Sequence, residues 1–250
     1  MPPALPFRLP KVIAHRGASG SAPENTLAAV RRAAELGARW VEVDVMVSRD
    51  GHPVIHHDHT LERCTDGAGS LLSCDLQSLR KLDAGSWYGD GFSGERIPTL
   101  EDLIALVTER GLGLNLELKP VAGWEGPTAR AVAKVLAANW PQRHPLLVSS
   151  FSERALAAFA ARLPGAPRGY LTTVVPPDWR DRLADTGCRT LHCAAGPLLR
   201  RETVVALKAA GVAVLAYTVN QLERAEELFD WGVAGVFSDH PERMGRYLDG

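Results

Sequence analysis

The chain has 250 residues, 46% of them hydrophobic, and its formal net charge is −1. This length and composition allow one domain with a large buried core. The charge balance excludes the global positive field that is typical of proteins that bind nucleic acid or an anionic membrane surface. No apolar run reaches the 18 residues that a membrane-spanning helix needs, so no span is expected.

Two features of the sequence concern the cellular compartment. The N-terminal stretch MPPALPFRLPK is rich in proline and lacks the continuous apolar core of a signal peptide, which predicts a cytoplasmic location. The cysteines form no CxxC pair and lack zinc-finger spacing, so we interpret them as reduced, apolar side chains. They are Cys64, Cys74, Cys188 and Cys193.

Short apolar runs that are typical of strands alternate along the chain with segments of helical periodicity. The predicted strands cover residues 11–15, 40–47, 112–118, 146–150, 168–172, 189–193, 212–218 and 233–237. The predicted helices include residues 24–36, 99–110, 126–139, 152–162, 200–210 and 221–231. Pro23 fits the first position of the first helix, and glycines that follow several helices fit C-terminal caps.

This alternation of strands and helices predicts an α/β fold with a parallel sheet. Eight such units in about 250 residues predict a (β/α)8 TIM barrel. An open, doubly wound sheet is the alternative, but no GxGxxG motif follows the first predicted strand. Residues 58–98 break the rhythm with loop-like sequence, and we interpret them as a small insertion after the second strand. A single domain over residues 1–250 is therefore expected.

The second predicted strand contains the sequence VEVDV, whose valines suit a packed surface. In a barrel the valines would face the helices, so that Glu42 and Asp44 point inward near the C-terminal rim. Glu117 and Lys119 share one face of the third strand in the same way. Three converging carboxylates would repel one another, and Mg²⁺ or Ca²⁺ would hold them ionised. The alternative is that these acids form ordinary salt bridges at solvated strand ends.

Histidines follow the first and second predicted strands. His15 and Arg16 end the first strand, and His57 follows the second in VIHHD. Two imidazoles beside a carboxylate cluster can act as general acid and general base near neutral pH. Arg16 and Lys119 add fixed positive charge that suits the binding of phosphate oxygens. Together these side chains predict metal-assisted phosphoryl chemistry.

Four segments of the sequence together resemble the glycerophosphodiester phosphodiesterase family. They are AHRGASGSAPENTLAA (14–29), EVDVMVSRDGHPVIHHDHTLERCTDGAG (42–69), NLELK (115–119), and YTVN followed by GVFSDHP, ending at residue 241. The resemblance implies a barrel enzyme that uses one divalent cation, Mg²⁺ or Ca²⁺, to hydrolyse glycerophosphodiesters. The products would be sn-glycerol 3-phosphate and an alcohol, and the expected partner is this small-molecule substrate alone.

The resemblance also implies roles for individual residues. The matching positions are catalytic His15 and His57, metal ligands Glu42, Asp44 and Glu117, and phosphate-binding Arg16 and Lys119. Tyr217 and Asn220, at the end of the seventh strand, are expected to contact the substrate. Tyr217 stands where the family usually has Trp, and Ser238 stands where it usually has Thr. These two departures concern substrate preference.

Some other polar and aromatic residues are expected to be structural, and for others a structural role and a role at the site both stay open. Strand alternation sends His56 and His57 to opposite sides, so His56 and His59 are expected to pack or to lie at the surface. Glu24 and Asn25 open the first predicted helix, where Glu24 suits the helix dipole and both could line the site. The three aromatic side chains of the insertion, Trp87, Tyr88 and Phe92, either cover the pocket or pack on one another.

A structural role is expected for His192 and Cys193 at the end of the sixth predicted strand.

Three alternative functions also fit parts of the sequence. The same barrel could be a phospholipase D-like or lysophospholipid-directed phosphodiesterase. It could bind glycerophosphodiesters without catalysis, although a pure binder has no need of an acid–base pair. It could be a sugar-phosphate enzyme, although GVFSD lacks the glycine-rich cradle of such sites.

Overall fold

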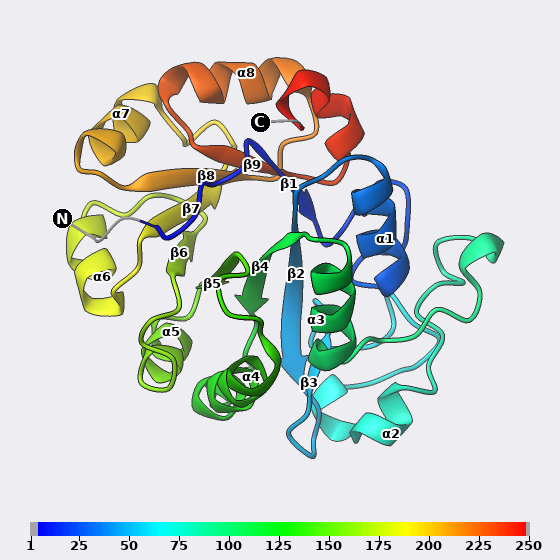
Figure 1. Cartoon of the computed structure of the whole chain (residues 1–250). Helices are drawn as coiled ribbons and strands as arrows, with labels where there is room; N and C mark the ends of the chain where they lie inside the picture. The colour runs from blue at the N-terminus through cyan, green and yellow to red at the C-terminus, as the bar shows by residue number, and fades with distance from the viewer. Residues whose placement is uncertain (1–4, 249–250) are drawn as a thin grey trace.

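The computed structural model of the chain describes residues 5–248, and within them parallel strands form a closed barrel with helices outside it (Figure 1). The barrel strands are β1 (Val12–His15), β2 (Trp40–Val47), β4 (Gly113–Leu118), β5 (Leu146–Ser150), β6 (Arg168–Thr172), β7 (Thr190–Ala194), β8 (Ala213–Tyr217) and β9 (Gly235–Ser238). β1 pairs with both β2 and β9, which closes the barrel. The predicted (β/α)8 fold is confirmed.

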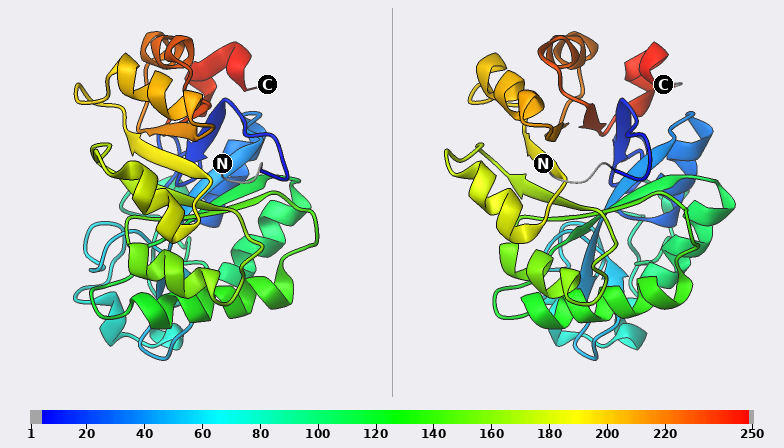
Figure 2. Two further views of the ribbon diagram at one scale, coloured as in Figure 1. Left: turned by 90° about the vertical axis from the view of Figure 1, so that its left-hand side faces the viewer. Right: turned by 60° about the vertical axis from the view of Figure 1, so that its left-hand side comes forward.

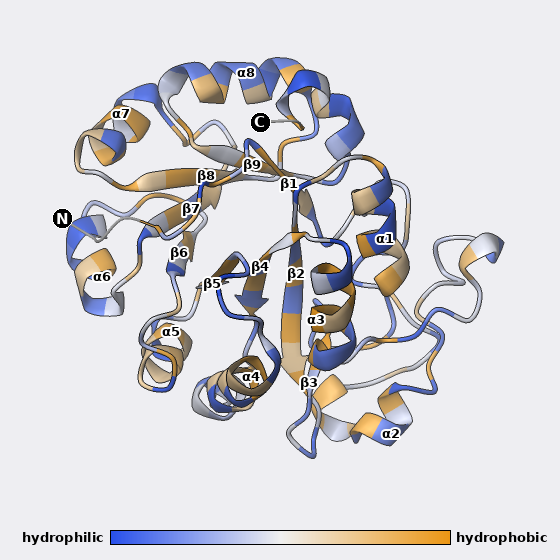
Figure 3. Cartoon of the chain, in the orientation of Figure 1, coloured by the Kyte–Doolittle hydropathy of each residue, from blue (hydrophilic) through white to orange (hydrophobic). Residues whose placement is uncertain are grey.

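The helices surround the barrel in all views (Figures 1 and 2). They are α1 (Leu27–Glu35), α3 (Leu100–Glu109), α4 (Glu125–Asn139), α5 (Glu153–Ala160), α6 (Trp179–Thr186), α7 (Arg201–Ala209) and α8 (Leu222–Trp231), with a final 3₁₀ segment η3 (Pro241–Tyr247). Each carries hydrophilic and hydrophobic residues along its length (Figure 3), and the apolar ones pack on the outward faces of the strands. Among residues 5–248, no helix has the length and apolar character needed to cross a membrane.

The start of the first helix was predicted wrongly. α1 begins at Leu27, where the Thr26 side chain accepts a hydrogen bond from the Ala29 amide as the N-cap. Asn25 has a φ of 59°, a left-handed conformation that a helix cannot contain. Pro23 and Glu24 therefore belong to a turn before the helix, and Glu24 does not occupy its first turn.

The insertion after β2 starts with a strand that the sequence did not predict. β3 (Pro53–Ile55) folds back antiparallel to β2, and the chain then passes through η1 (Leu71–Ser73), α2 (Leu76–Leu79) and η2 (Asp90–Phe92) before α3. This segment is drawn in cyan and teal beside α1 and α3 in Figure 1. It has its own small apolar cluster, which includes Leu61, Leu71, Leu79 and Ile97.

The interior of the barrel is apolar at the N-terminal end of the strands and polar at the C-terminal end. A cluster around Trp40, Leu147 and Leu215 fills the barrel toward the N-terminal end of the strands. Gly113 makes room for the indole, because a Cβ at this position would lie 2.3 Å from the Trp40 ring. The buried polar side chains nearer the C-terminal ends include Glu42, Asp44, Asn115, Glu117, Ser149 and His192. The fold thus directs the chemically active residues toward one rim.

Candidate active site

A cavity of about 280 Å³ opens at the C-terminal end of the barrel. Its lining residues are His15, Arg16, Glu42, His57, Asn115, Glu117, Lys119, Phe151, Leu171, His192, Tyr217, Thr218 and Phe237. Most of the side chains expected at the site therefore face one space. A larger hollow of about 750 Å³, mainly apolar and beside Trp140 and Leu163, lies at the opposite end and contains none of them.

Three carboxylates from two neighbouring strands converge at this cavity. Glu42 and Asp44 lie on β2 and Glu117 lies on β4, with Asp44 and Glu117 paired in register. One oxygen from each lies within 4.8 Å of the others, and the three residues are 3%, 1% and 8% exposed. Such a set of buried oxygen donors is the kind that hard divalent cations prefer.

The electrostatics of the three acids also favour a bound cation. Burial, followed by the charges of Asp44 and Glu117, raises the pKa of Glu42 well above its usual range. Burial and the charge of Asp44 raise the pKa of Glu117 to about 7. Glu42 Oε1 is buried and accepts no hydrogen bond from any residue between 5 and 248. A cation at this point would offset both the repulsion and the unsatisfied oxygen.

Two positive side chains border the acids without pairing with all of them. Arg16 Nε lies 3.4 Å from Asp44 Oδ2, and its backbone amide donates to Glu42 Oε2 over 2.9 Å. Lys119 Nζ lies 3.3 Å from Glu117 Oε1 and 3.8 Å from Asp44 Oδ1. Glu42 has no guanidinium partner among the described residues. Its ion-pair partner is His15 Nε2 at 3.9 Å, which carries charge only when protonated, so one arginine or lysine for each acid does not account for the cluster.

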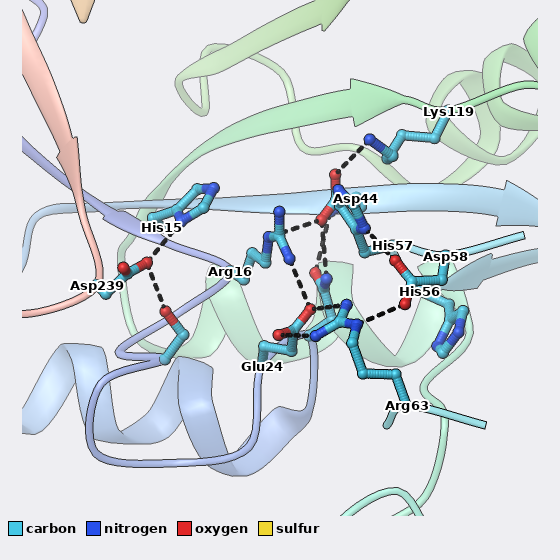
Figure 4. A network of polar contacts seen from close by, with 12 residues as sticks. His15, Arg16, Glu24, Asp44, His56, His57, Asp58, Arg63, Lys119 and Asp239 are labelled. Carbon is cyan, nitrogen blue, oxygen red and sulfur yellow. Dashed lines mark hydrogen bonds and ion pairs between the residues drawn. The ribbon is translucent and has the colours of Figure 1, made fainter. Parts of the chain in front are cut away.

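Both histidines are held through Nδ1 by a carboxylate (Figure 4). His15 Nδ1 lies 2.6 Å from Asp239 Oδ1, and His57 Nδ1 lies 2.5 Å from Asp58 Oδ1. The pKa of His57 lies below its usual value because the ring is buried, and the nearby charge of Asp44 offsets only part of this effect. With Nδ1 engaged in each ring, Nε2 is the nitrogen left to exchange a proton with a molecule in the cavity.

The whole chain, and not the cavity alone, is similar to known proteins. The sequence model of the glycerophosphoryl diester phosphodiesterase family matches residues 15–243. The chain belongs to this family. A glycerophosphodiester phosphodiesterase from Caldanaerobacter subterraneus subsp. tengcongensis is 35% identical over 236 residues, which are 93% of this chain and 95% of the relative.

Solved structures agree with this membership. An Oleispira antarctica phosphodiesterase in complex with the product sn-glycerol-3-phosphate is 46% identical, with a TM-score of 0.94 and coverage of 97% of this chain and 98% of that one. A glycerophosphodiester phosphodiesterase from Agrobacterium tumefaciens is 27% identical, with a TM-score of 0.81 over 97% of this chain and 100% of that one. The chain is thus an enzyme of the glycerophosphodiester phosphodiesterase family.

Several hydrogen bonds that hold the expected site residues in place were not predicted from the sequence. Asp239, which holds His15, also accepts hydrogen bonds from Ser19 Oγ and Asn220 Nδ2. Asn25 makes two hydrogen bonds with Asp44, one to its carboxylate and one from its backbone amide. The signal that could have found them was their place inside the matched segments.

An ion-pair network extends from the site into the insertion (Figure 4). Arg63 donates to Asp58 through Nε and to both carboxylate oxygens of Glu24, at 2.7 and 2.8 Å. Glu24 in turn accepts a 2.7 Å hydrogen bond from Arg16 Nη1. Arg63 therefore links Asp58, which holds His57, to Glu24, which holds Arg16. It also fixes the insertion against the turn before α1.

The remaining predicted residues lie in different surroundings. Tyr217 lines the cavity, and its hydroxyl donates to the Thr172 carbonyl over 3.0 Å. Asn220 is not one of the cavity-lining residues in the described chain, and its contact with substrate stays a prediction. His56 is buried with Nε2 at 3.1 Å from the Thr60 carbonyl, and His59 is exposed, so these rings do not converge with His57.

The aromatic residues of the insertion pack on one another. Trp87 and Phe92 each meet Tyr88 edge to face at 5.5 Å between ring centroids. They are absent from the lining of the active-site cavity as far as residues 5–248 show it. Of the two interpretations, packing within the insertion is the one that the geometry favours.

The ion pairs of Glu24 predict a loss of stability in acid. Burial alone would raise the pKa of this carboxyl, but hydrogen bonds and charges from Arg63 and Arg16 lower it from 4.5 to about 2. A depressed folded-state pKa means that the pairs stabilise the fold above pH 4.5 and lose this contribution as the pH falls toward 2. Urea titrations at several pH values should show Glu24→Gln less stable than wild type near neutrality, with the gap closing in acid.

The matched control for this experiment is Glu109→Gln at the exposed end of α3. It should show no such gap in the free energy of unfolding at any pH. A gap for Glu24→Gln that stays constant down to pH 2 would contradict the assigned pairing.

Proposed function

We propose that this enzyme hydrolyses glycerophosphodiesters to sn-glycerol 3-phosphate and an alcohol, using one divalent cation and two catalytic histidines, His15 and His57. The main support is one cavity lined by two carboxylate-held imidazoles, two members of an acidic triad and two positive side chains. The 46% identical Oleispira antarctica phosphodiesterase, whose complex contains sn-glycerol-3-phosphate, supports the identity of the product.

Glu42, Asp44 and Glu117 would hold the cation. Their oxygen donors and the unsatisfied Glu42 Oε1 fit Mg²⁺ or Ca²⁺. When bound, the cation supplies neutralising charge for the three carboxylates and polarises a phosphate oxygen. It would also keep Glu42 and Glu117 ionised, against the burial that raises the pKa of each.

Arg16 and Lys119 bind the non-bridging oxygens of the phosphodiester. Each side chain now shares its charge with carboxylates of the acidic triad. With a cation on those carboxylates, both positive groups can donate to phosphate oxygens, where negative charge builds up during the reaction. Tyr217 contacts the substrate from the opposite wall, and Asn220 acts indirectly by holding Asp239.

The two histidines transfer protons through Nε2. One accepts the proton of the attacking group as the new P–O bond forms. That group is either a water, or a glycerol hydroxyl that gives a cyclic phosphate, which a water then opens to sn-glycerol 3-phosphate in a second step. The other histidine donates a proton to the departing alkoxide as its P–O bond breaks. Asp239 and Asp58 keep each Nδ1 protonated and each ring oriented, and they stabilise the imidazolium form that arises in turn.

A phospholipase D-like or lysophospholipid-directed reaction is not favoured. It would need an apolar surface from the insertion at the cavity mouth, whereas Trp87, Tyr88 and Phe92 pack edge to face and do not line the cavity as described for residues 5–248. A sugar-phosphate enzyme and a barrel that only binds are likewise not favoured by the family to which the chain belongs.

Metal removal tests the proposal. Protein stripped with EDTA is expected to release no sn-glycerol 3-phosphate from glycerophosphocholine or glycerophosphoethanolamine, because the acidic triad alone repels the phosphate. Added Mg²⁺ or Ca²⁺ should restore release, followed by an enzyme-coupled assay for the product. Untreated protein is the control. Full activity in EDTA would overturn the metal requirement, and no product with either cation would overturn the reaction itself.

A further inference from the structure

His192 lines the active-site cavity but has no part in the chemistry proposed above. It lies on β7 with its ring inside the barrel, fully buried at 0% exposure. Nε2 lies 2.8 Å from Thr190 Oγ1, and the ring centroid lies 5.3 Å from that of Phe237. A buried polar ring of this kind needs partners for both of its nitrogens.

The second nitrogen of His192 lacks such a partner. Nδ1 is buried and makes no hydrogen bond within the described part of the chain. Nε2 shares a hydrogen bond with the Thr190 hydroxyl, which can donate to it or accept from it, so Nδ1 lacks a partner in either tautomer of the neutral ring. Burial lowers the pKa of His192 to about 3, and the ring is accordingly neutral near pH 7. Nδ1 is therefore a buried polar atom with no hydrogen-bond partner among residues 5–248.

An unused acceptor lines the same cavity on β4. Asn115 is 1% exposed, and its Nδ2 donates to Ser149 Oγ over 3.0 Å. Nδ2 thus has a partner, whereas Oδ1 has no hydrogen-bond partner in residues 5–248. The cavity is thus lined by two residues with a buried polar atom, His192 Nδ1 and Asn115 Oδ1, that has no hydrogen-bond partner among residues 5–248.

The chain makes room for the imidazole. A Cβ at Gly169 on β6 would lie 2.5 Å from both His192 Nε2 and Thr190 Oγ1. Any larger residue at this position would displace the ring or its hydroxyl partner. Glycine at residue 169 and threonine at 190 together hold His192 in one orientation.

We propose that His192 and Asn115 form the subsite for the hydroxyl groups of the glycerol moiety. His192 Nδ1 forms a hydrogen bond with one hydroxyl, which can accept from it or donate to it as the tautomer requires, and a second hydroxyl donates its proton to Asn115 Oδ1. A diol satisfies both groups at once, whereas a simple alkyl ester of phosphate leaves them buried and unpaired. The inference rests on the proposed function, and it makes these two residues determinants of specificity for glycerol over other groups on the phosphate.

Binding of two ligands to the His192→Leu variant tests this subsite. In the presence of Mg²⁺ or Ca²⁺, the Kd of sn-glycerol 3-phosphate should rise about tenfold, as the loss of one hydrogen bond predicts. The Kd of inorganic phosphate, which has no glycerol, should stay unchanged in isothermal titration calorimetry. kcat/KM for glycerophosphocholine should fall in parallel.

Two further variants separate hydrogen bonding from packing. The side-chain amide of His192→Asn can donate from near the position of Nδ1, and it should restore part of the affinity for sn-glycerol 3-phosphate. Gly169→Ala, which displaces the ring, should reproduce the selective loss. Urea midpoints of all variants show whether each one is folded.

The inference is overturned if His192→Leu weakens both ligands equally, or neither, since His192 would then only pack against Phe237. A wild-type protein that binds neither ligand also overturns it. Selective loss in a protein that hydrolyses no diester would contradict the proposed function and leave the subsite standing. Full hydrolysis without selective loss would contradict the subsite alone.

Discussion

Replacing His57 by alanine is expected to lower kcat for glycerophosphocholine by about 10² to 10⁴, the usual contribution of a general acid or base. The ring lines the cavity, is half-buried and is held by Asp58 over 2.5 Å. The Arg63 links to Asp58 and Glu24 do not depend on the imidazole. The variant should therefore fold normally.

The matched control is His52→Ala, just before β3, because His52 is exposed and lies outside the cavity lining. Its kcat should equal that of the wild type. Circular dichroism and urea denaturation would establish that both variants are folded. A fall of less than tenfold for a folded His57→Ala protein would show that this ring transfers no proton in the rate-limiting step.

The second large effect is expected for Glu42→Gln, which should weaken Mg²⁺ or Ca²⁺ binding at least about 100-fold. Loss of partners outside the first layer of ligands already costs 10- to 100-fold, and this change removes a charged ligand itself. Activity should be lost with the cation. Isothermal titration of metal-stripped protein measures the affinity directly.

The same substitution separates a metal ligand from a structural salt bridge. Without a cation, burial and the neighbouring acids raise the pKa of Glu42 well above its usual range, so its neutral form resembles glutamine. Glu42→Gln in EDTA should then be as stable to urea as the wild type. A marked loss of stability in EDTA, with cation binding unchanged, would mean that Glu42 has a structural role. Asp185→Asn, at an exposed position of α6, is the neutral control.

The strands could be predicted closely because those of a closed parallel barrel are buried on both faces. β2, β5 and β6 coincide with the predicted ranges, since their apolar runs end where the burial ends. α6 was missed because WRDRLADT is mainly polar and buries Trp179, Leu183 and Thr186 alone among its described residues. The start of α1 was misplaced because Pro23 hid the left-handed turn at Asn25.

The part of the candidate site that lies at strand ends could be predicted from the sequence. Glu42, Asp44 and Glu117 were expected to converge from strand alternation alone, and the described geometry brings their oxygens together. Partners across the chain could not be found in this way. Asp239 lies 224 positions from His15, and the pairing of β1 with β9 brings them into contact.

Hydrogen bonding of buried atoms is also invisible in a sequence. His192 was expected to have a structural role at the end of its strand. Its unused Nδ1, next to a glycine that makes room for the ring, emerges only from the arrangement of β6 and β7. The same holds for Oδ1 of Asn115.

A crystal of the protein soaked in Ca²⁺ and recorded for anomalous scattering would test the central claim most directly. The proposed function predicts one peak among the carboxylates of Glu42, Asp44 and Glu117, within about 2.3 to 2.6 Å of their oxygens. A peak elsewhere, or none in crystals of an enzyme that is active in the same solution, would contradict a cation at the acidic triad.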